Sequence, residues 1–503
     1  MAKLNIVNPP KGLIAGLLAL IVLSLILAWL DMQGFSNYDR EFLGAKALQA
    51  LTGAEPRYRA IVSIFPPLLV YGSLILGSAV TLQVLLGAIL IGLLVWQIGT
   101  LAVAKIWHWV WIALILFNPA FILMLLRSPA WVGVSIFLTL LMVLLWKLAQ
   151  DKPSPNLPTT LLLVLLGLGL APLMLLRYES WFILPSIALI LAMLFPQESW
   201  GFKFTAILVT LFMSLVLIAT WLYINWLFTG DPYYFLNSHY SGMRLAETKI
   251  FLQQEDFWAS WWSSISWIFQ VVPIYLLIAG WALWQNKHWL TSAVILLLPV
   301  MFVAVAFWQG TFMSEVSRFG IFLGVLPLIL QQFPPKKFWQ QCVLTAALVI
   351  NLFVSVTLLQ QSQLVPEEIL LWRQITQQDV SDSPSVQQWR EQKQAQREIA
   401  QVLFERLLPG QKVLMDDAVN FPIIYLVNDA SYFILPYQNE FFLTLQQPDL
   451  LTDFILVPNT QTRGSEQDRI LSYWPQLAET TLPGFQEVFS SSHYKLLQRL
   501  SSP

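Results

Sequence analysis

Two carboxylates, Asp39 and Glu41, follow closely on the first strongly hydrophobic stretch of the chain, residues 12–30. They are the first clustered charges in the sequence, and they would lie where a membrane helix meets water. A carboxylate at that boundary can act as a general base on a substrate whose lipid tail stays in the hydrocarbon. Arg40, between them, allows a second interpretation, in which Asp39 forms only a surface ion pair at a helix start.

Three arginines, Arg127, Arg177 and Arg318, stand at the ends of other hydrophobic stretches. Arginine presents a planar fork that holds phosphate oxygens with two hydrogen bonds, so these residues are candidates for binding a phosphate leaving group. The alternative is that they reach lipid headgroups or pair with carboxylates inside the protein. Glu179 is placed to orient Arg177, whereas Glu315, three residues before Arg318, is expected to form an ordinary salt bridge.

A long loop is expected after residue 228. It opens with the turn signal Gly230-Asp231-Pro232 and continues into an aromatic run that would lie at the bilayer surface. Asp231 and His239 are candidate substrate-binding residues, with an ordinary surface histidine as the alternative for His239. Residues 255–262 read as an interfacial helix, and a loop of this kind could grip a lipid carrier.

The amino-acid composition indicates that membrane-spanning helices must position these residues. The chain has 503 residues, of which 57% are hydrophobic and 11% charged, with a mean hydropathy of +0.63, so it is expected to be a polytopic membrane protein. The single cysteine, Cys342, excludes an internal disulfide, and the four histidines show no metal-ligand spacing. No cofactor is therefore predicted, a divalent cation is left open, and no nucleic-acid partner is expected.

The charge balance divides the chain near residue 360. Residues 1–360 carry 18 Lys and Arg against 12 Asp and Glu, whereas residues 361–503 carry 10 against 17. The tail predicts an amphipathic helix over 384–408 and helical stretches around Phe441 and over 467–473. Strand-like runs occur at 412–415, 423–426, 432–435 and 454–457. The tail is therefore expected to form a small α/β domain. This domain has no glycine-rich phosphate loop or nucleophile elbow, so its expected role is to bind the acceptor or to shield the candidate site.

Hydropathy indicates twelve candidate spans, at 12–30, 61–78, 79–103, 106–126, 131–149, 159–176, 179–195, 204–228, 264–285, 289–308, 316–331 and 338–359. If all twelve cross, the lysines of the short loops fall outside, against the positive-inside rule. If residues 61–103, interrupted by Pro66-Pro67, make one net crossing, eleven crossings remain. The inner side then holds Lys3, Lys11, Lys105, Lys147, Lys152, Lys203, Lys287, Lys336 and Lys337.

Four short motifs, in this order, resemble those of the GT-C membrane glycosyltransferases, in particular the group related to protein mannosyltransferases and aminoarabinose transferases. They are Asp39-Arg40-Glu41, Pro66-Pro67, Arg177-Tyr178-Glu179-Ser180-Trp181 and Gly230-Asp231-Pro232. The resemblance covers residues 1 to about 330 and implies a polyprenyl-phosphate sugar donor, with an acidic active-site residue in the first outer loop. That residue maps onto Asp39 and less surely onto Glu41, because Arg40 splits the usual adjacent Asp-Glu.

Two classes of function compete. In a lipid-linked sugar transferase, Asp39 would deprotonate the acceptor while arginines stabilise the departing polyprenyl phosphate. In a transporter or flippase, charged residues would line a path near the bilayer midplane between two related halves. The transferase is favoured because the sequence shows no internal repeat and its charges collect at one face; a non-catalytic assembly subunit is a third option. The expected setting is the plasma or inner membrane, with the site facing the periplasm or exterior and a protein, lipid or glycan acceptor.

The topology can be tested by reporter fusions. We expect an inner N-terminus, eleven net crossings and an outer domain over 361–503, because odd parity places every short-loop lysine on the inner face. A reporter fused after Pro503 should behave as external and one inserted after Lys152 as cytoplasmic. A cytoplasmic reporter at Pro503 would contradict both the topology and the outward-facing site.

Overall fold

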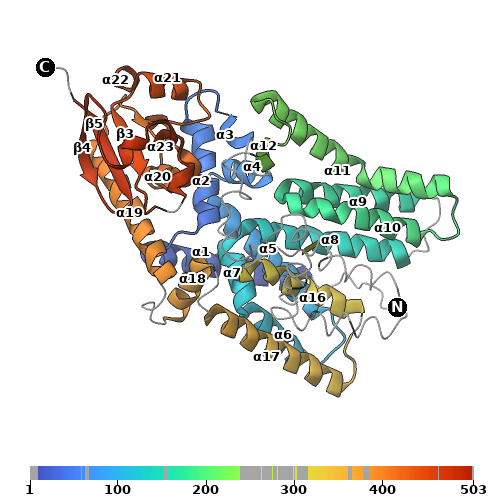
Figure 1. Ribbon diagram of the computed structural model, residues 1–503. Helices are drawn as coiled ribbons and strands as arrows, with labels where there is room; N and C mark the ends of the chain where they lie inside the picture. Colours follow the sequence, from blue (N-terminus) through green and yellow to red (C-terminus); the bar gives the residue numbers. More distant parts are fainter. Residues whose placement is uncertain are drawn as a thin grey trace. The chain divides into compact units, whose positions relative to one another are not determined.

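The computed structural model describes residues 9–57, 59–62, 67–150, 157–237, 315–332, 334–360, 365–377, 384–462 and 464–500, together with six single residues between 262 and 302. The chain divides into two compact units (Figure 1). The first comprises Met1–Phe35, Val80–Trp221 and Glu247–Gln378, and the second comprises Ser36–Ala79, Leu222–Ala246 and Asp379–Pro503. The loop that follows the first hydrophobic stretch therefore belongs with the C-terminal domain.

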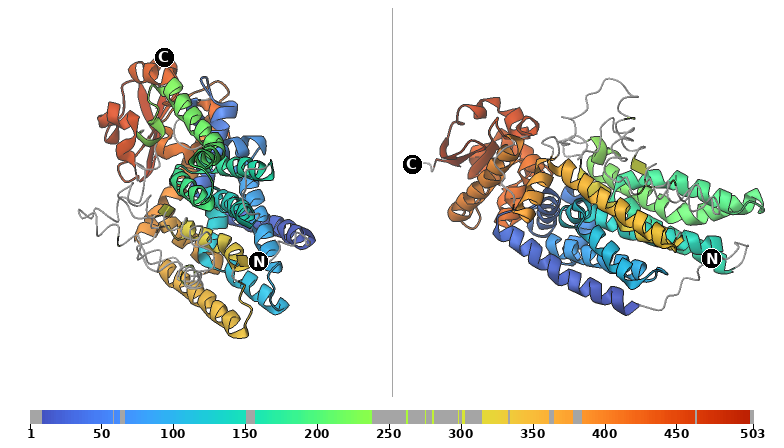
Figure 2. Two further views of the ribbon diagram at one scale, coloured as in Figure 1. Left: turned by 90° about the vertical axis from the view of Figure 1, so that its right-hand side faces the viewer. Right: turned by 90° about the horizontal axis from the view of Figure 1, so that it is seen from below.

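The first unit is helical. Its longer described elements are α1 (Pro9–Met32), α5 (Ala79–Gly99), α6 (Lys105–Leu116), α7 (Pro119–Arg127), α8 (Pro129–Gln150), α9 (Leu157–Leu176), α10 (Ile183–Leu194), most of α11 (Trp200–Thr229), α16 (Gly320–Gln332), α17 (Phe338–Gln360) and α18 (Pro366–Thr376); the last residues of α11, from Leu222, belong to the second unit. Helices α8 and α9 lie side by side in both figures (Figures 1 and 2). Helices α1 and α5 approach each other so closely that a Cβ atom added at Gly92 would lie 2.9 Å from the carbonyl oxygen of Gly12. Small residues permit such contacts between membrane helices.

Among the described residues, six helices are long and apolar enough to cross a bilayer, and the pair α6 and α7, bent by 60°, would make a seventh. They correspond to the predicted spans beginning at residues 12, 79, 106, 131, 159, 204 and 338. These are the helices of a multi-pass membrane protein. The predicted spans at 179–195 and 316–331 are shorter apolar helices, and those at 264–285 and 289–308 lie almost wholly outside the described residues. The total of eleven crossings stays a prediction.

The predicted span at 61–78 is described only in part. Its described part consists of the end of α3 (Arg59–Val62) and α4 (Leu68–Ile75), which has only 8 residues. At 1.5 Å per residue, α4 is about 12 Å long, far less than the ~30 Å of hydrocarbon. Helix α4 therefore cannot cross a bilayer by itself, as expected of a segment that contributes no complete span.

The second unit is built on a five-stranded sheet with the order β2-β1-β3-β5-β4. The strands are β1 (Val413–Leu414), β2 (Phe433–Ile434), β3 (Phe454–Pro458), β4 (Phe485–Ser490) and β5 (Tyr494–Arg499). Strand β1 pairs in parallel with β2 and β3, whereas β5 pairs antiparallel with β3 and β4. The helices of this unit include α2 (Tyr38–Thr52), α12 (Tyr234–Asn237), α19 (Pro384–Arg406), α20 (Asp417–Val427), α21 (Glu440–Gln446), α22 (Pro448–Leu451) and α23 (Arg469–Tyr473).

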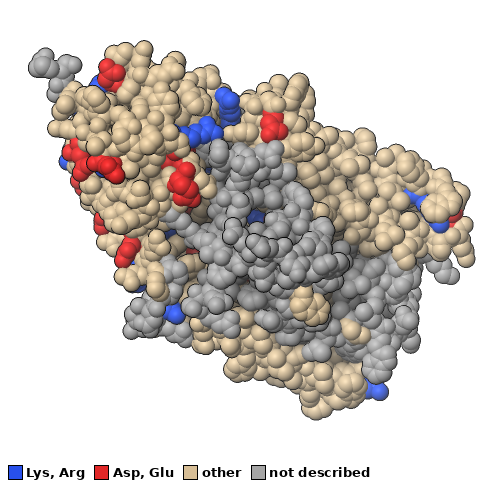
Figure 3. All heavy atoms as spheres, in the orientation of Figure 1, with Lys and Arg blue, Asp and Glu red and all other residues tan. Residues whose placement is uncertain are grey.

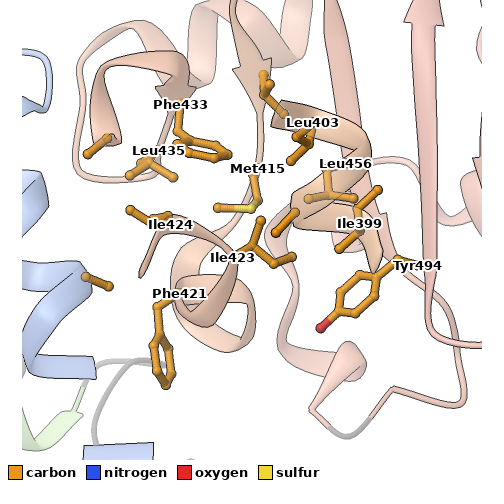
Figure 4. Packing of buried hydrophobic residues seen from close by; sticks show 14 of the residues in the cluster. Ile399, Leu403, Met415, Phe421, Ile423, Ile424, Phe433, Leu435, Leu456 and Tyr494 are labelled. Atoms are coloured by element: carbon orange, nitrogen blue, oxygen red, sulfur yellow. The ribbon is translucent and has the colours of Figure 1, made fainter. Parts of the chain in front are cut away.

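Alternate residues of the central strands feed two separate cores. Val413 and Phe454 point into the larger core, shown in Figure 4 with residues of α19 and α20. Leu414 and Ile455 point to the opposite face, toward the core formed with α21 and α23. This period of two is what a sheet covered on both faces requires. Phe42 of α2 joins the larger core, which explains why the segment after the first hydrophobic stretch packs with the C-terminal domain.

Most predictions for the tail are confirmed. The amphipathic helix, the helices near Phe441 and Tyr473, and the strands near residues 413, 433 and 454 all occur where expected. The strand predicted at 423–426 was wrong, because those residues belong to α20. Asp416 caps that helix by accepting a hydrogen bond from the Ala418 amide at 2.9 Å, and the helix buries Ile423 and Ile424. Strands β4 and β5 were missed, and three of the six residues of β4 are exposed.

A buried ion pair joins α2 to α20. The Nζ atom of Lys46 lies 2.7 Å from Oδ2 of Asp417, with side-chain exposures of 5% and 4%. Gln49 donates a second hydrogen bond of 2.8 Å to the same carboxylate oxygen. A buried pair of this kind is sensitive to the loss of either partner, because the remaining charge keeps its full desolvation penalty.

Replacing Lys46 with Met should therefore lower the free energy of unfolding by about 3–5 kcal/mol, because Asp417 keeps its buried charge without a cation. The matched control is Arg57→Met, which breaks the exposed pair of Arg57 and Glu55 and should cost less than about 1 kcal/mol. Thermal unfolding of the purified full-length variants measures both effects. Equal stability of the two variants would show that the Lys46 pair does not hold α2 in place.

Candidate functional site

Asp39 lies in the first turn of α2. Asn37 caps this helix, accepting a hydrogen bond of 2.7 Å from the Arg40 amide through Oδ1. The helix dipole favours carboxylates in that turn, where Asp39 is half-buried. Arg40, between the two carboxylates, is almost fully buried. Asp39 is the seventh residue after Met32, the last residue of α1.

Glu41 has a different environment from Asp39. Its carboxylate forms an ion pair with Lys393 of α19 and accepts a hydrogen bond from the Ser36 hydroxyl. It is 1% exposed. Residues two apart on a helix project to different faces, so one carboxylate is buried while the other remains partly accessible. Of the two predicted catalytic carboxylates, Asp39 is therefore the more accessible one.

Arg127, the last residue of α7, is surrounded by three carboxylates. It donates from Nε to Glu367 at 2.9 Å and from Nη1 to Glu368 at 3.0 Å, and its Nη2 lies 3.3 Å from Glu315. Glu368 also accepts hydrogen bonds from the amides of Val316 and Ser317. Burial raises the pKa of Glu368, and the charge of Arg127 opposes that rise.

The other two arginines pair with nearby carboxylates. Arg318 pairs with Glu315 at i,i+3 spacing, so Glu315 bridges Arg318 and Arg127; the ordinary salt bridge predicted for Glu315 is confirmed. Arg177 pairs with Glu179, and its guanidinium lies 4.9 Å from the ring centroid of Trp131. The charge of Arg177 also acts on Glu315, which places all three arginines in one charged cluster of the first unit.

This arginine cluster contains partners that the sequence analysis did not identify. Glu367 and Glu368 follow Pro366 in the first turn of α18, a common signature of a helix start. They lie more than 200 residues from Arg127 in sequence, so no local sequence pattern could predict their ion pairs with Arg127. The guanidinium groups donate to carboxylates, and a phosphate would have to compete with them. Asp39, Glu41 and Asp231 belong to the second unit.

The loop motif at residue 230 forms the predicted turn. Gly230 has φ of +77°, a conformation that favours glycine, and Asp231 accepts a hydrogen bond of 2.8 Å from the Tyr233 amide. This contact gives Asp231 a structural role in the turn. His239 and the interfacial helix predicted at 255–262 lie outside the described residues, except for Trp262.

Two buried aspartates of the second unit have shifted pKa values. Burial, together with the nearby Asp417 charge, raises the pKa of Asp416 to about 6. Burial and the charge of Asp416 raise the pKa of Asp468 well above its usual value. Asp416 accepts hydrogen bonds from the amides of Ala418 and Arg469, and Asp468 caps α23 through the amides of Ile470 and Leu471. These contacts assign both aspartates a structural role in holding α20 against α23.

Charged side chains are unevenly distributed. On the face shown in Figure 3, acidic side chains gather over the second unit, whereas the described surface of α9 and α11 is largely uncharged. Among the residues that the structure describes, no group of three or more His, Cys, Asp and Glu is arranged to hold a metal ion. No family model matches the chain, and no curated protein matches its sequence.

The aspartate pair predicts a pH dependence of stability. Because the native pKa values are raised, the native state holds protons that the unfolded chain releases near pH 4, so this contribution is complete below about pH 4 and is lost as pH rises through about 6. Asp468→Asn keeps a capping acceptor but removes a buried charge. At pH 7.5 it should raise the Tm by roughly 2–4 °C, equivalent to about 1 kcal/mol.

At pH 4 the same variant should match the wild type, because the carboxyls are then protonated. Asp449→Asn, at an exposed position of α22, is the control and should leave the Tm unchanged at both pH values. Thermal unfolding of the full chain at the two pH values measures the difference. A variant that is destabilised equally at pH 4 and pH 7.5 would contradict the raised pKa values.

Proposed function

We propose that the protein is an integral membrane glycosyltransferase that moves a sugar from a polyprenyl-phosphate carrier to an acceptor at the outer face of the membrane. The observation that carries the proposal is the partly accessible Asp39, which is the seventh residue after a helix long enough to span a bilayer. Its neighbour Glu41 forms a buried ion pair with Lys393. A reactive carboxylate beside the end of a span suits a substrate with one end in lipid and the other in water.

In the proposed reaction, Asp39 removes the proton of an acceptor hydroxyl. The acceptor oxygen attacks the anomeric carbon from the face opposite the phosphate, the bond from that carbon to the phosphate oxygen breaks, and polyprenyl phosphate leaves with the bonding electrons. A single displacement of this kind inverts the anomeric configuration and forms no covalent sugar intermediate.

The arginine cluster is proposed to act on the phosphate. Arg127, Arg177 and Arg318 supply the fork geometry that phosphate prefers, although Glu179, Glu315, Glu367 and Glu368 hold their donors in the absence of substrate. A leaving phosphate would gain hydrogen bonds as it displaces one of these carboxylates. Among the described ion pairs, Arg177 and Arg318 each pair with a single carboxylate, whereas Arg127 pairs with three, so such an exchange would release either of them more readily than Arg127.

Asp39→Asn tests the base. Asparagine keeps the shape and a weak acceptor, so the variant should fold and bind carrier lipid while sugar transfer falls by roughly 10²- to 10⁴-fold. Asp31→Asn, at an exposed position near the end of α1, is the matched control and should retain transfer within about twofold. The assay uses purified protein in nanodiscs, a panel of polyprenyl-phosphate sugars carrying labelled sugar, and membrane extract as the acceptor.

Near-normal turnover by Asp39→Asn would move the base elsewhere, with Glu41 the first alternative. In Glu41→Gln, Lys393 loses its carboxylate partner, so a stability loss accompanies any loss of transfer. Thermal unfolding of each variant therefore separates a catalytic defect from a structural one.

A further inference from the structure

The second unit contains a pocket of about 280 Å³, and all of its lining residues belong to that unit. Its walls come from α2, α3, α20, α21 and α23, from the chain around residue 438 and from the end of α11 with α12. Pockets for drug-sized molecules begin at about 300 Å³, so this one has room for a smaller group. Asp39 and Glu41 are not among the lining residues, so the pocket does not include the proposed base.

Three lining side chains have hydrogen-bonding capacity that the described contacts leave unused. The Nζ atom of Lys46 donates to Asp417 Oδ2 at 2.7 Å and to Gln49 Oε1 at 3.1 Å, which leaves its third N–H. Gln49 donates to the same Asp417 oxygen at 2.8 Å, so among the described contacts Oδ1 of Asp417 accepts no hydrogen bond. The exposed Asn439 forms no side-chain hydrogen bond within the part of the chain that the structure describes.

These three groups carry no net charge. Lys46 and Asp417 neutralise each other in a buried ion pair, and the third group is a neutral amide. Arg59 and Arg469 also reach the pocket, but both interact with other groups of the protein, and the charge of Arg469 acts on the buried Asp416. What the pocket offers is therefore a donor, an acceptor and an amide. This set favours a neutral ligand, because an ion of either sign would meet the like-charged member of the buried pair.

The remaining wall of the pocket is apolar and aromatic. It includes Tyr234 of α12, Phe442 of α21, Pro436 and Tyr437. Phe442 is 56% exposed, so its ring has a face that a ligand can cover. Gln438 donates a hydrogen bond of 3.3 Å to the Tyr437 hydroxyl and so fixes that part of the wall. Aromatic rings beside a few placed polar groups are the usual lining of a small-molecule site.

We propose that this pocket binds one neutral sugar ring of a carbohydrate acceptor. A sugar carries hydroxyl groups on neighbouring carbons, and each hydroxyl both donates and accepts. Such a pair of hydroxyls can accept from Lys46 and donate to Asp417 Oδ1 at the same time, while Asn439 bonds a further hydroxyl. The apolar C–H face of the ring lies against Phe442. The assignment of the sugar as acceptor rests on the proposed glycosyl transfer, whereas sugar binding itself does not require it.

Saturation-transfer difference NMR of the full-length protein in phosphatidylcholine nanodiscs, without any sugar donor, tests the site. The probes are the methyl glycosides of glucose, galactose and mannose, and at least one of them should bind. Asn439→Ala and Phe442→Ala should each weaken that binding by about 3- to 10-fold, because the first loses a hydrogen bond and the second an apolar contact. Both positions are exposed, so the variants should fold as the wild type does.

Leu443→Ala and Gln447→Ala are the matched controls and should bind as the wild type does, since both residues are exposed, lie within or next to α21 and do not line the pocket. The proposal is overturned if the wild type binds none of the three methyl glycosides, or if Asn439→Ala and Phe442→Ala bind as tightly as the controls. Asp39→Asn should keep its sugar binding. Binding without sugar transfer would therefore contradict the catalytic proposal alone, and transfer without binding would contradict the pocket alone.

Discussion

Buried positive charge must be matched by carboxylates, and this constraint shapes the first unit. Arg127 stands at the end of an apolar helix and is matched by Glu315, Glu367 and Glu368, which lie near η3 (Val316–Phe319) and α18. An unpaired arginine in such surroundings would carry an uncompensated desolvation penalty of several kcal/mol. The ion pairs therefore specify which segments meet, in a bundle whose apolar surfaces alone discriminate little between neighbours.

The same constraint shapes the second unit. Lys46 with Asp417 and Lys393 with Glu41 attach α2 to α20 and α19, while Phe42 of α2 enters the sheet core. Asp39 is the more accessible of the two carboxylates in the first turn of α2, because it is half-buried whereas Glu41 is almost fully buried. Fixed supports of this kind hold reactive side chains in one geometry, which catalysis and binding both require.

Local patterns were enough to predict the long apolar helices, α19 and three of the five strands, because hydropathy and periodicity act over short segments. The run at 423–426 misled because β-branched residues buried on a helix resemble a strand, and the Asp416 cap decides between them. Contacts such as Arg127 with Glu367 could not be predicted, since 240 residues separate the partners. Asp39 could be singled out by its position after the first span.

The central claim is that the sugar is transferred while its carrier stays behind. Proteoliposomes containing the purified protein and a polyprenyl-phosphate sugar, labelled separately on the sugar and on the lipid, test it directly when acceptor is supplied outside. The account predicts that the sugar label moves to the acceptor, that the lipid label is recovered as polyprenyl phosphate, and that nuclear magnetic resonance shows an inverted anomeric configuration in the product. Movement of both labels together across the bilayer without transfer would identify a transporter, and a retained configuration would contradict the single displacement at Asp39.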